Sequence, residues 1–487
     1  MMACDTADVT HHRSEPSRGI AALFATSDAT MVCDDATMPA RDLLVGADRM
    51  LAALRAQGVQ RGDRICLHRG NDRHAVQLLL AAALGGLVCV AVNTRYSTAE
   101  ADDLIARSGA WRVNDAVFAA SDDPAAHTTG EDPLQDRRES PFVVFTTSGT
   151  TSRPKMVLHR QASIVDHAHD VVTGFRYQPH DTIAVVLPLC GTFGLTGLMS
   201  AVAADARVVL ANFATDALTT RFATERVTAM NGSDDMFHRL IVAGADLSRL
   251  RLGGFAQFNA SLTDIAQRAD DVGGTVVGLY GMSELQALFA VRDPHADTAE
   301  RSRAGGTIVS PRAACTVVDD ELWLRGPSMF AGYLAEGGDR IDEDLTARHF
   351  HTDGDNVWFR TGDLATLDDE RTFHYQARLG DVLRLGGYLV APADIIDVVC
   401  SAPGVADAQV VAVARESGTR PVAFVIAHEG AVVDERVVIE HCAQYLARFK
   451  VPVRVVSVTE FPVTDGPNGV KVRLTELRER AQQLLDE

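Results

Sequence analysis

The segment at 146–155 brings hydroxyl groups, a glycine and a lysine together in one short loop. It reads Thr-Thr-Ser-Gly-Thr-Thr-Ser-Arg-Pro-Lys and directly follows the apolar, β-type run at 142–145. Backbone N–H groups, several hydroxyls and the ammonium of Lys155 in one loop suit an anion, above all a polyphosphate. The spacing is not that of a P-loop, because no glycine precedes Lys155 and no Ser or Thr follows it. Taken alone, the segment has a second interpretation as a polar surface turn.

Further motifs follow along the chain in a fixed order. They are Leu-Tyr-Gly-Met-Ser-Glu at 279–284, Glu-Leu-Trp-Leu-Arg-Gly-Pro-Ser-Met-Phe-Ala-Gly-Tyr at 321–333, Phe-Arg-Thr-Gly-Asp at 359–363, Arg-Leu-Gly-Asp-Val-Leu-Arg-Leu-Gly-Gly at 378–387 and Asn-Gly-Val-Lys at 468–471. With Gly-Asp at 62–63 and Val-Asn at 92–93, this order resembles the adenylate-forming superfamily of AMP-binding enzymes. That superfamily includes acyl-CoA synthetases, aryl-acid ligases, luciferase-like enzymes and carrier-protein-loading adenylation domains, and the resemblance spans most of the chain.

The resemblance implies a two-step reaction. A carboxylate oxygen attacks the α-phosphate of ATP, pyrophosphate leaves, and a second nucleophile then opens the acyl adenylate. Fixed donors and cations must neutralise the charge on the α-phosphate and on the leaving group. The implied cofactors are ATP, Mg²⁺ and CoA.

The resemblance also assigns roles to individual residues. Lys471 would carry the adenylation step, Ser283 would donate to the α-phosphate, and Glu284 with Thr147 would hold Mg²⁺. Asp363 and Arg378 would bind the ribose, and Tyr280 beside Gly281 would stack on adenine. The phosphate loop would use Thr146, Thr147, Ser148, Gly149, Thr150, Thr151 and Lys155.

The acyl pocket is the part of the site that the motifs define least. By resemblance its lining is Gly191, Phe193, Met230, Asp234, Gly253, Gly254, Phe255, Gly278 and Met282. The segment at 188–194 offers no Asp that would bind an α-ammonium, which argues against an α-amino acid. Ser233, Asp234 and Asp235 either face the pocket, and then imply a substrate with a donor group, or cap the following helix.

The sequence departs from the family pattern at several positions. Ser152 and Met156 stand where relatives have glycine, and Val470 adds one residue before Lys471. Gly380 occupies the place of the inter-domain hinge, where glycine eases the backbone rotation that domain alternation needs. Gly386 and Gly387 resemble the pair that lets a pantetheine arm approach, although a tight turn also suits Gly-Gly.

Apolar periodicity predicts the elements that position these motifs. Short β-type runs at 64–67, 87–92, 182–187 and 206–210 alternate with helical patterns at 43–54, 77–84, 195–203 and 217–225, and 119–140 reads as a surface loop. The predicted class is α/β, with a large N-terminal α/β part of several subdomains (sheets covered by helices plus a small β-barrel-like part) and a small mobile α+β C-terminal domain. The expected domains are 1–377 for AMP binding and adenylation, a hinge at 378–381 and a mobile domain at 382–487.

Composition narrows the class of protein. The 487 residues carry 46 Lys and Arg against 65 Asp and Glu, a net charge of −19. This charge disfavours nucleic acid and anionic lipid as partners. Cys4 and the other cysteines form no CxxC pair and are expected to be reduced thiols, and no signal peptide or membrane span is apparent. We therefore expect a cytoplasmic enzyme, monomer or homodimer, with a small carboxylic acid as substrate.

Alternatives remain at this stage. A CoA ligase acting on an aromatic or medium-sized acid is the leading hypothesis, but a carrier-protein pantetheine or an amine would serve the same adenylation step as acceptor. A non-catalytic adenylate-binding protein is a further alternative. It would be expected to have lost Lys471, Glu284 or Asp363, and all three are present.

Overall fold

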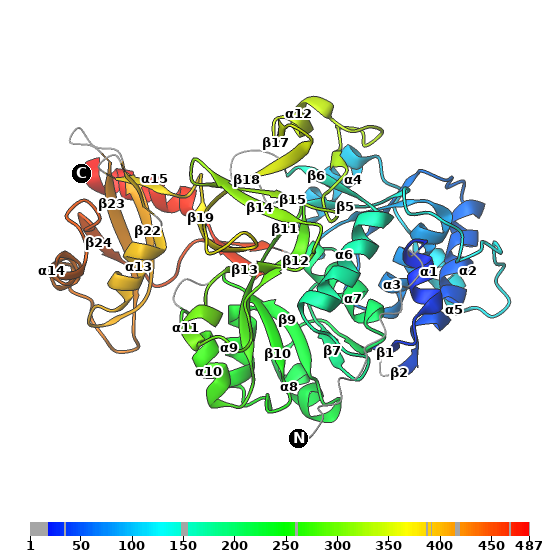
Figure 1. Ribbon diagram of the computed structural model, residues 1–487, viewed down its shortest axis with the longest axis horizontal. Helices are drawn as coiled ribbons and strands as arrows, with labels where there is room; N and C mark the ends of the chain where they lie inside the picture. The colour runs from blue at the N-terminus through cyan, green and yellow to red at the C-terminus, as the bar shows by residue number, and fades with distance from the viewer. Residues whose placement is uncertain are drawn as a thin grey trace, which may run out of the picture.

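The computed structural model describes residues 18–33, 36–147, 154–258, 262–385, 388–390, 392–413, 419–466 and 469–486. Most of the described chain is a large α/β part, and the segments beyond residue 382 gather at one side of it (Figure 1). The predicted fold class is confirmed: helices cover sheets in the large part, and a smaller α+β part follows.

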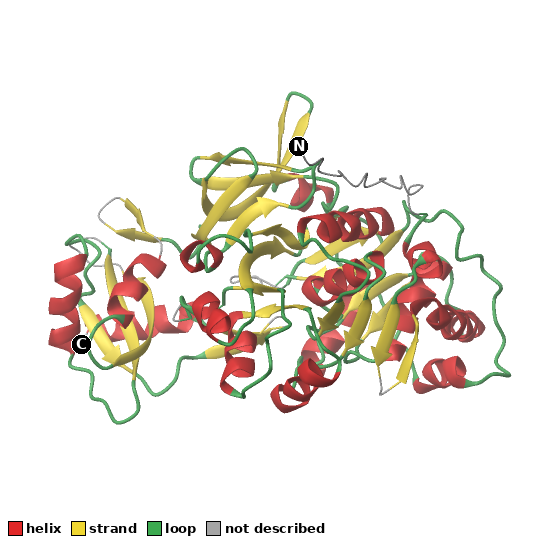
Figure 2. Cartoon of the chain, turned by 60° about the horizontal axis from the view of Figure 1, so that its bottom comes forward, coloured by secondary structure: helices red, strands yellow, loops and turns green. Residues whose placement is uncertain are grey.

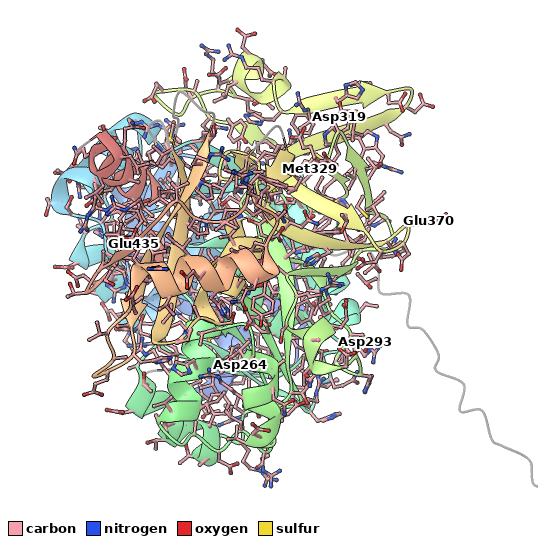
Figure 3. The ribbon with its side chains drawn as sticks, turned by 90° about the vertical axis from the view of Figure 1, so that its left-hand side faces the viewer. Asp264, Asp293, Asp319, Met329, Glu370 and Glu435 are labelled. Atoms are coloured by element: carbon pink, nitrogen blue, oxygen red, sulfur yellow. The ribbon has the colours of Figure 1, made fainter. Side chains whose placement is uncertain are left out.

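The larger sheet has a mostly parallel half and an antiparallel half that meet at β11. The first half runs in the order β2 (Ala36–Pro39), β1 (Thr30–Cys33), β8 (Arg207–Leu210), β7 (Thr182–Val185), β9 (Ala229–Ser233), β10 (Leu252–Ala256) and β11 (Val276–Met282). The second half continues through β12 (Gln286–Val291), β13 (Gly305–Ile308), β19 (Thr372–Arg378), β18 (Asn356–Leu367), β15 (Glu321–Arg325) and β14 (Ala314–Val318), with β17 (Phe350–Asp353) on β18. Figure 3 labels Asp319 and Glu370 at hairpin turns of this half.

A second sheet lies across a layer of helices from the first. Its order is β16 (Gly332–Tyr333), β6 (Met156–Arg160), β5 (Pro141–Thr146), β4 (Val88–Ala91) and β3 (Arg64–Leu67). The main core joins both sheets through α1 (Ile20–Thr26), α2 (Leu43–Ala56), α3 (Arg73–Gly85), α6 (Gln161–Gly174) and α7 (Thr192–Ala203). On its other face the larger sheet packs against α8 (Thr215–Thr224), α9 (Asp234–Val242) and α10 (Ile265–Asp271). Figure 2 shows helices on both sides of the strands.

Local sequence signals explain several of these boundaries. Asp72 caps α3 by accepting a hydrogen bond from the amide of Ala75, and Ser97 with Glu100 forms a capping box on α4 (Thr98–Ser108). Asn114 caps α5 (Asp115–Asp122), so the surface loop predicted at 119–140 begins later, after a helix. The remaining short helices are η1 (Ala40–Asp42), α11 (Thr298–Arg301) and α12 (Glu343–Ala347).

The C-terminal part has its own apolar clusters. Its elements are β20 (Leu383–Leu385), β21 (Tyr388–Val390), α13 (Pro392–Cys400), β22 (Val405–Val413), β23 (Arg420–Ala427), α14 (Glu435–Tyr445), β24 (Arg454–Ser457), β25 (Val463–Gly466), β26 (Gly469–Val472) and α15 (Leu474–Asp486). Both faces of the sheet β22-β23-β24 are covered by residues that lie beyond position 382. An independent core of this kind allows the part to move as a unit.

Two expectations from composition can be compared with the structure. Within the described chain the cysteines form no disulfide, and Cys400 is the one among them that is only partly buried. Within the described ranges, no helix has both the length and the apolar character that a bilayer crossing requires.

Candidate active site

The ends of the candidate phosphate loop are fixed by strands β5 and β6. Thr146 pairs with Met156 across the two antiparallel strands, and the amide of Thr147 donates to the carbonyl of Lys155 over 3.1 Å. The hydroxyls of Tyr96 and Thr146 lie 3.2 Å apart. The predicted phosphate ligands Ser148, Gly149, Thr150 and Thr151 lie outside the described residues.

Lys155, at the end of this loop, points at a histidine that the motifs did not reveal. Its Nζ lies 2.9 Å from Nε2 of His349 and 4.8 Å from the ring centre of Tyr333. Burial, with the charges of Lys155 and Arg360, lowers the pKa of His349 to about 4. The imidazole is therefore neutral near pH 7 and accepts a hydrogen bond from the ammonium. Burial also lowers the pKa of Lys155, and the charge of Glu284 opposes that shift.

Ser283 and Glu284 occupy a tight turn between β11 and β12. The turn spans residues 283–285, and the next residue, Gln286, has a left-handed backbone with φ of 66°. Glu284 is only 6% exposed and accepts a hydrogen bond of 2.8 Å from the hydroxyl of Tyr333. Tyr333 closes the motif at 321–333, but its sequence context gave it no role.

Two buried histidines hold the backbone of this turn and of the strand that follows. Nε2 of His159 lies 2.7 Å from the carbonyl of Ser283, and Nε2 of His167 lies 2.7 Å from the carbonyl of Ala287. Burial lowers the pKa of each histidine to about 4. Both rings are therefore neutral near pH 7 and donate their Nε2–H to the carbonyls. Neither residue belongs to a recognised motif, and the contacts span 120 residues or more of chain.

Gly281 permits the close approach of the two strands beside this turn. A Cβ at position 281 would lie 2.5 Å from the Cα of Ala287, which is part of the backbone and cannot move aside. The glycine is therefore required by the packing of the hairpin itself, apart from any role toward a nucleotide.

Asp363 of β18, Tyr280 of β11 and Arg378 of β19 form a second cluster through their side chains. Asp363 is 1% exposed, its Oδ2 accepts a 2.5 Å hydrogen bond from the Tyr280 hydroxyl, and its Oδ1 lies 3.0 Å from Nε of Arg378. Burial raises the pKa of Asp363, and the Arg378 charge opposes that rise. The cluster presents a carboxylate whose orientation is fixed from two sides. The ring of Tyr280 packs edge-on against Phe373, with ring centres 5.1 Å apart.

The predicted acyl-pocket residues divide between the two faces of the larger sheet. Met230 and Phe255 pack with Phe237 and the helices α8–α10, away from α7. Phe193, by contrast, lies on the α7 face. Asn231, next to Met230 in β9, faces Gly254, and a Cβ on Gly254 would lie 2.4 Å from its Oδ1. Asn231 was not among the predicted residues, although the alternation of side chains along a strand points to it once the face is known.

The remaining pocket residues have structural partners. Gly191 is the residue before α7, and Met282 lies beside Tyr280, with its sulfur 3.6 Å from the tyrosine hydroxyl. The positions of Gly253 and Gly278 are crowded. A Cβ at position 253 would lie 2.8 Å from the Phe237 ring, and a Cβ at position 278 would lie 2.0 Å from the carbonyl oxygen of Arg303.

Ser233, Asp234 and Asp235 begin helix α9. The Ser233 side chain accepts a hydrogen bond from the amide of Met236. Ser233 therefore caps the helix, which was the alternative to its facing the acyl pocket. Asp234 is fully buried and accepts hydrogen bonds from the amides of Asp235 and Phe258. Its carboxylate therefore ties the start of α9 to the end of β10.

The candidate hinge is a turn between β19 and β20. The amides of Asp381 and Val382 both donate to the carbonyl of Arg378, and Gly380 sits within this turn with nothing within 4 Å of the place of a Cβ. Gly386 and Gly387 lie outside the described residues. Lys471 is in β26, paired with Thr464 of β25, and its side chain lies outside the description.

Comparisons with known proteins agree with this arrangement. The model of the AMP-binding enzyme family matches residues 112–334, and that of the AMP-binding enzyme C-terminal domain matches 397–465. A (7a-methyl-1,5-dioxo-octahydro-1H-inden-4-yl)propanoyl:CoA ligase of Mycobacterium tuberculosis is 29% identical, over 90% of this chain and 92% of that protein. A 2-succinylbenzoate--CoA ligase of Listeria innocua is 25% identical, over 90% of this chain and 93% of its own length.

Solved structures share the fold. ATP-bound MatB from Rhodopseudomonas palustris superposes with a TM-score of 0.81 at 24% identity, covering 95% of this chain and 99% of that one. The O-succinylbenzoate Coenzyme A synthetase of Bacillus subtilis in complex with AMP also reaches 0.81, at 21% identity, covering 95% and 98%. On the two family matches, the ordered motifs and this shared fold, the chain belongs to the adenylate-forming superfamily of AMP-binding enzymes.

Proposed function

We propose that the protein is an ATP-dependent, AMP-forming carboxylate–CoA ligase. In the first step an oxygen of the acid attacks the α-phosphate, the bond from that phosphorus to the bridging oxygen breaks, and pyrophosphate leaves. In the second step the CoA sulfur attacks the acyl carbon, the bond to AMP breaks, and the thiol proton passes to solvent. The family and the CoA ligases among the relatives support this activity.

One observation carries the proposal beyond the family match. The buried carboxylate of Asp363 is held by Tyr280 and Arg378, and Tyr280 stands on the strand that leads into the Ser283–Glu284 turn. A fixed carboxylate suits paired ribose hydroxyls, because it accepts several hydrogen bonds at once. The turn that follows would then face the phosphates of the same nucleotide. We assign Asp363 and Arg378 to the ribose on this basis.

The charges around the turn fit MgATP as the substrate. Lys155 would neutralise phosphate oxygens after leaving His349, and Glu284 would offer a hard carboxylate oxygen to Mg²⁺ while Tyr333 holds its Oε1. Within the described ranges no group of three or more His, Cys, Asp or Glu residues could hold a metal. That suits a Mg²⁺ ion whose other ligands are phosphate oxygens and water. Lys471 would reach the α-phosphate from the C-terminal domain, with Gly380 as the pivot.

The test is acid-dependent exchange of labelled pyrophosphate into ATP, with no acceptor present. Benzoates, cinnamates, heteroaryl acids, aliphatic acids and amino acids form the panel, and Asp363→Asn provides the site control. We expect exchange with one class of acid, a loss of at least about tenfold in Asp363→Asn, and CoA-dependent release of AMP with that acid. Absence of exchange with every acid, while ATP still binds, would overturn the proposal.

A further inference from the structure

A small cavity lies between strand β7 and helix α7, on the face of the larger sheet that carries Asn231. Residues 183–187, Phe193, Gly194, Gly197 and Asn231 line it, and it measures about 10 Å³. A space of this size holds about one water molecule or one group of similar size. Apart from Asn231, its lining side chains are apolar or absent.

Asn231, the polar residue of this lining, carries an atom that lacks a hydrogen-bond partner among the described residues. The residue is 7% exposed, and its Nδ2 donates to the hydroxyl of Tyr177 over 2.8 Å. Within the part of the chain that the structure describes, its Oδ1 has no hydrogen-bond partner. A buried acceptor left without a partner destabilises the fold, so such an atom is normally satisfied by an ordered water or by a group of a bound ligand.

The cavity belongs to the same sheet as the candidate active site. Asn231 pairs with Gly254, which pairs with Val277 of β11, and β11 leads directly to Tyr280 and Ser283. Ser283 is six positions after Val277, so the two lie at most about 20 Å apart along an extended strand. Ligands of parallel α/β sheets bind beyond the carboxyl ends of the strands. A long substrate entering there could reach Asn231 with its far end.

We propose that the acid substrate carries a hydroxyl group at the end remote from its carboxylate, and that Oδ1 of Asn231 accepts its hydrogen. This inference rests on the proposed function. The cavity has room for one hydroxyl, and the unsatisfied acceptor makes a methyl group in that place unfavourable. Of the two alternatives for Ser233, Asp234 and Asp235, the structure shows the helix cap, with Asp234 engaged by backbone amides. In this proposal the polar group that recognises the substrate is therefore Asn231.

The test uses acids that differ only in their remote substituent. The scaffolds are 3-cyclohexylpropanoate, benzoate and cinnamate, each with hydroxyl, methyl or hydrogen at ring position 4 (para in the aromatic acids). The cyclohexyl scaffold is also tested as the 4-oxo acid. The measured quantity is kcat/KM for pyrophosphate exchange. On every scaffold that exchanges, we expect the hydroxy acid to exceed the methyl acid by roughly tenfold to a hundredfold. Asn231→Leu should bring that ratio to one or below. Met199→Leu, a volume-conserving change in α7 outside the cavity lining, is the control and should preserve it.

A second variant covers the case in which Asn231→Leu does not fold. Gly197→Ala adds a methyl group where nothing lies within 4 Å, and alanine favours the helix, so the fold should be kept. Because the new methyl group takes up the cavity, both para-substituted acids should lose at least fivefold relative to the unsubstituted acid.

Three outcomes would overturn the inference. Equal kcat/KM for hydroxy and methyl acids on an active scaffold would remove the role of Asn231. A preference for the ketone would mean that the amide is turned, with Tyr177 donating to Oδ1 and Nδ2 facing the cavity. Absence of exchange with any acid, in the wild-type protein, would overturn the proposed function itself and is thereby distinguished from the other two.

Discussion

His159 offers a sharp test of how the Ser283–Glu284 turn is held. Its Nε2–H donates to the carbonyl of Ser283 from a fully buried ring. His159→Gln keeps a donor at nearly the same place but removes the titration. His159→Leu removes both, and leaves the carbonyl without its partner at a cost of about 1–3 kcal/mol. We expect His159→Gln to retain most pyrophosphate exchange at pH 7.5, and His159→Leu to lose about tenfold to a hundredfold through misplacement of the turn.

The pH dependence follows from the buried state of the ring. Burial lowers the pKa of His159 from 6.5 to about 4, so between these values the unfolded chain binds more protons than the folded one. The contribution of His159 to the free energy of unfolding is therefore fully present above about pH 6.5 and is lost as the pH falls toward 4. From pH 7 to pH 5 this histidine alone contributes a loss of about 2 kcal/mol, and His167, with a pKa also lowered to about 4, contributes a similar loss.

Urea unfolding followed by tryptophan fluorescence measures this effect. Trp111, Trp323 and Trp358 all precede the hinge, so the signal reports the large part of the chain. His159→Gln should show about 2 kcal/mol less acid destabilisation than the wild type between pH 7 and pH 5, and His295→Gln, at an exposed position, should match the wild type. If His159→Gln loses as much stability as the wild type over this interval, the buried neutral histidine is not the cause and the reasoning is refuted.

Three further substitutions test the assignments away from this turn. Lys471→Ala should lower pyrophosphate exchange by at least about a hundredfold and spare thioester formation from supplied acyl adenylate, and equal loss in both assays would remove its assigned role. Gly380→Pro should uncouple the half-reactions by restricting the pivot, which comparison of exchange with overall thioester formation would reveal; unchanged turnover would contradict the hinge. Asp234→Ala should lower the free energy of unfolding by about 1–3 kcal/mol, because the Phe258 amide loses its acceptor, without altering the ranking of acids in the exchange panel.

The regular elements were predictable where periodicity and capping agree. The strand expected at 64–67 is β3 with the same bounds, and the helical pattern at 195–203 is the later part of α7. The expected loop at 119–140 failed at its start, since the Asn114 cap and the short apolar face of α5 extend a helix to Asp122. Acidic and small residues at the end of this helix resemble a loop by composition. The Asn114 cap, five positions before the expected start of the loop, was the signal that could have corrected the prediction.

The candidate site was predictable only where a motif carried it. Asp363, Glu284 and Lys155 were named from ordered motifs, but their partners Tyr333 and His349 depend on contacts across the sheets. Such contacts form by strand register and turn geometry, which short sequence windows do not contain. The acyl pocket shows the same limit. A shift of one residue in β9 exchanges Met230 for Asn231 and thereby exchanges one face of the sheet for the other.

The strain stored beside the turn explains why so many buried partners gather there. Gln286 and Leu288 have φ values of 66° and 61°, a conformation that costs a residue with a Cβ about 1 kcal/mol or more. The side chain of Gln286 donates to the carbonyls of Ser163 and Ser328, and His167 donates to the carbonyl between the two strained residues. These hydrogen bonds offset the strain, so the backbone that presents Ser283 and Glu284 is fixed before any nucleotide arrives. Because the turn is ordered before the nucleotide binds, no binding energy is consumed in ordering it. That binding energy can instead stabilise the transition state.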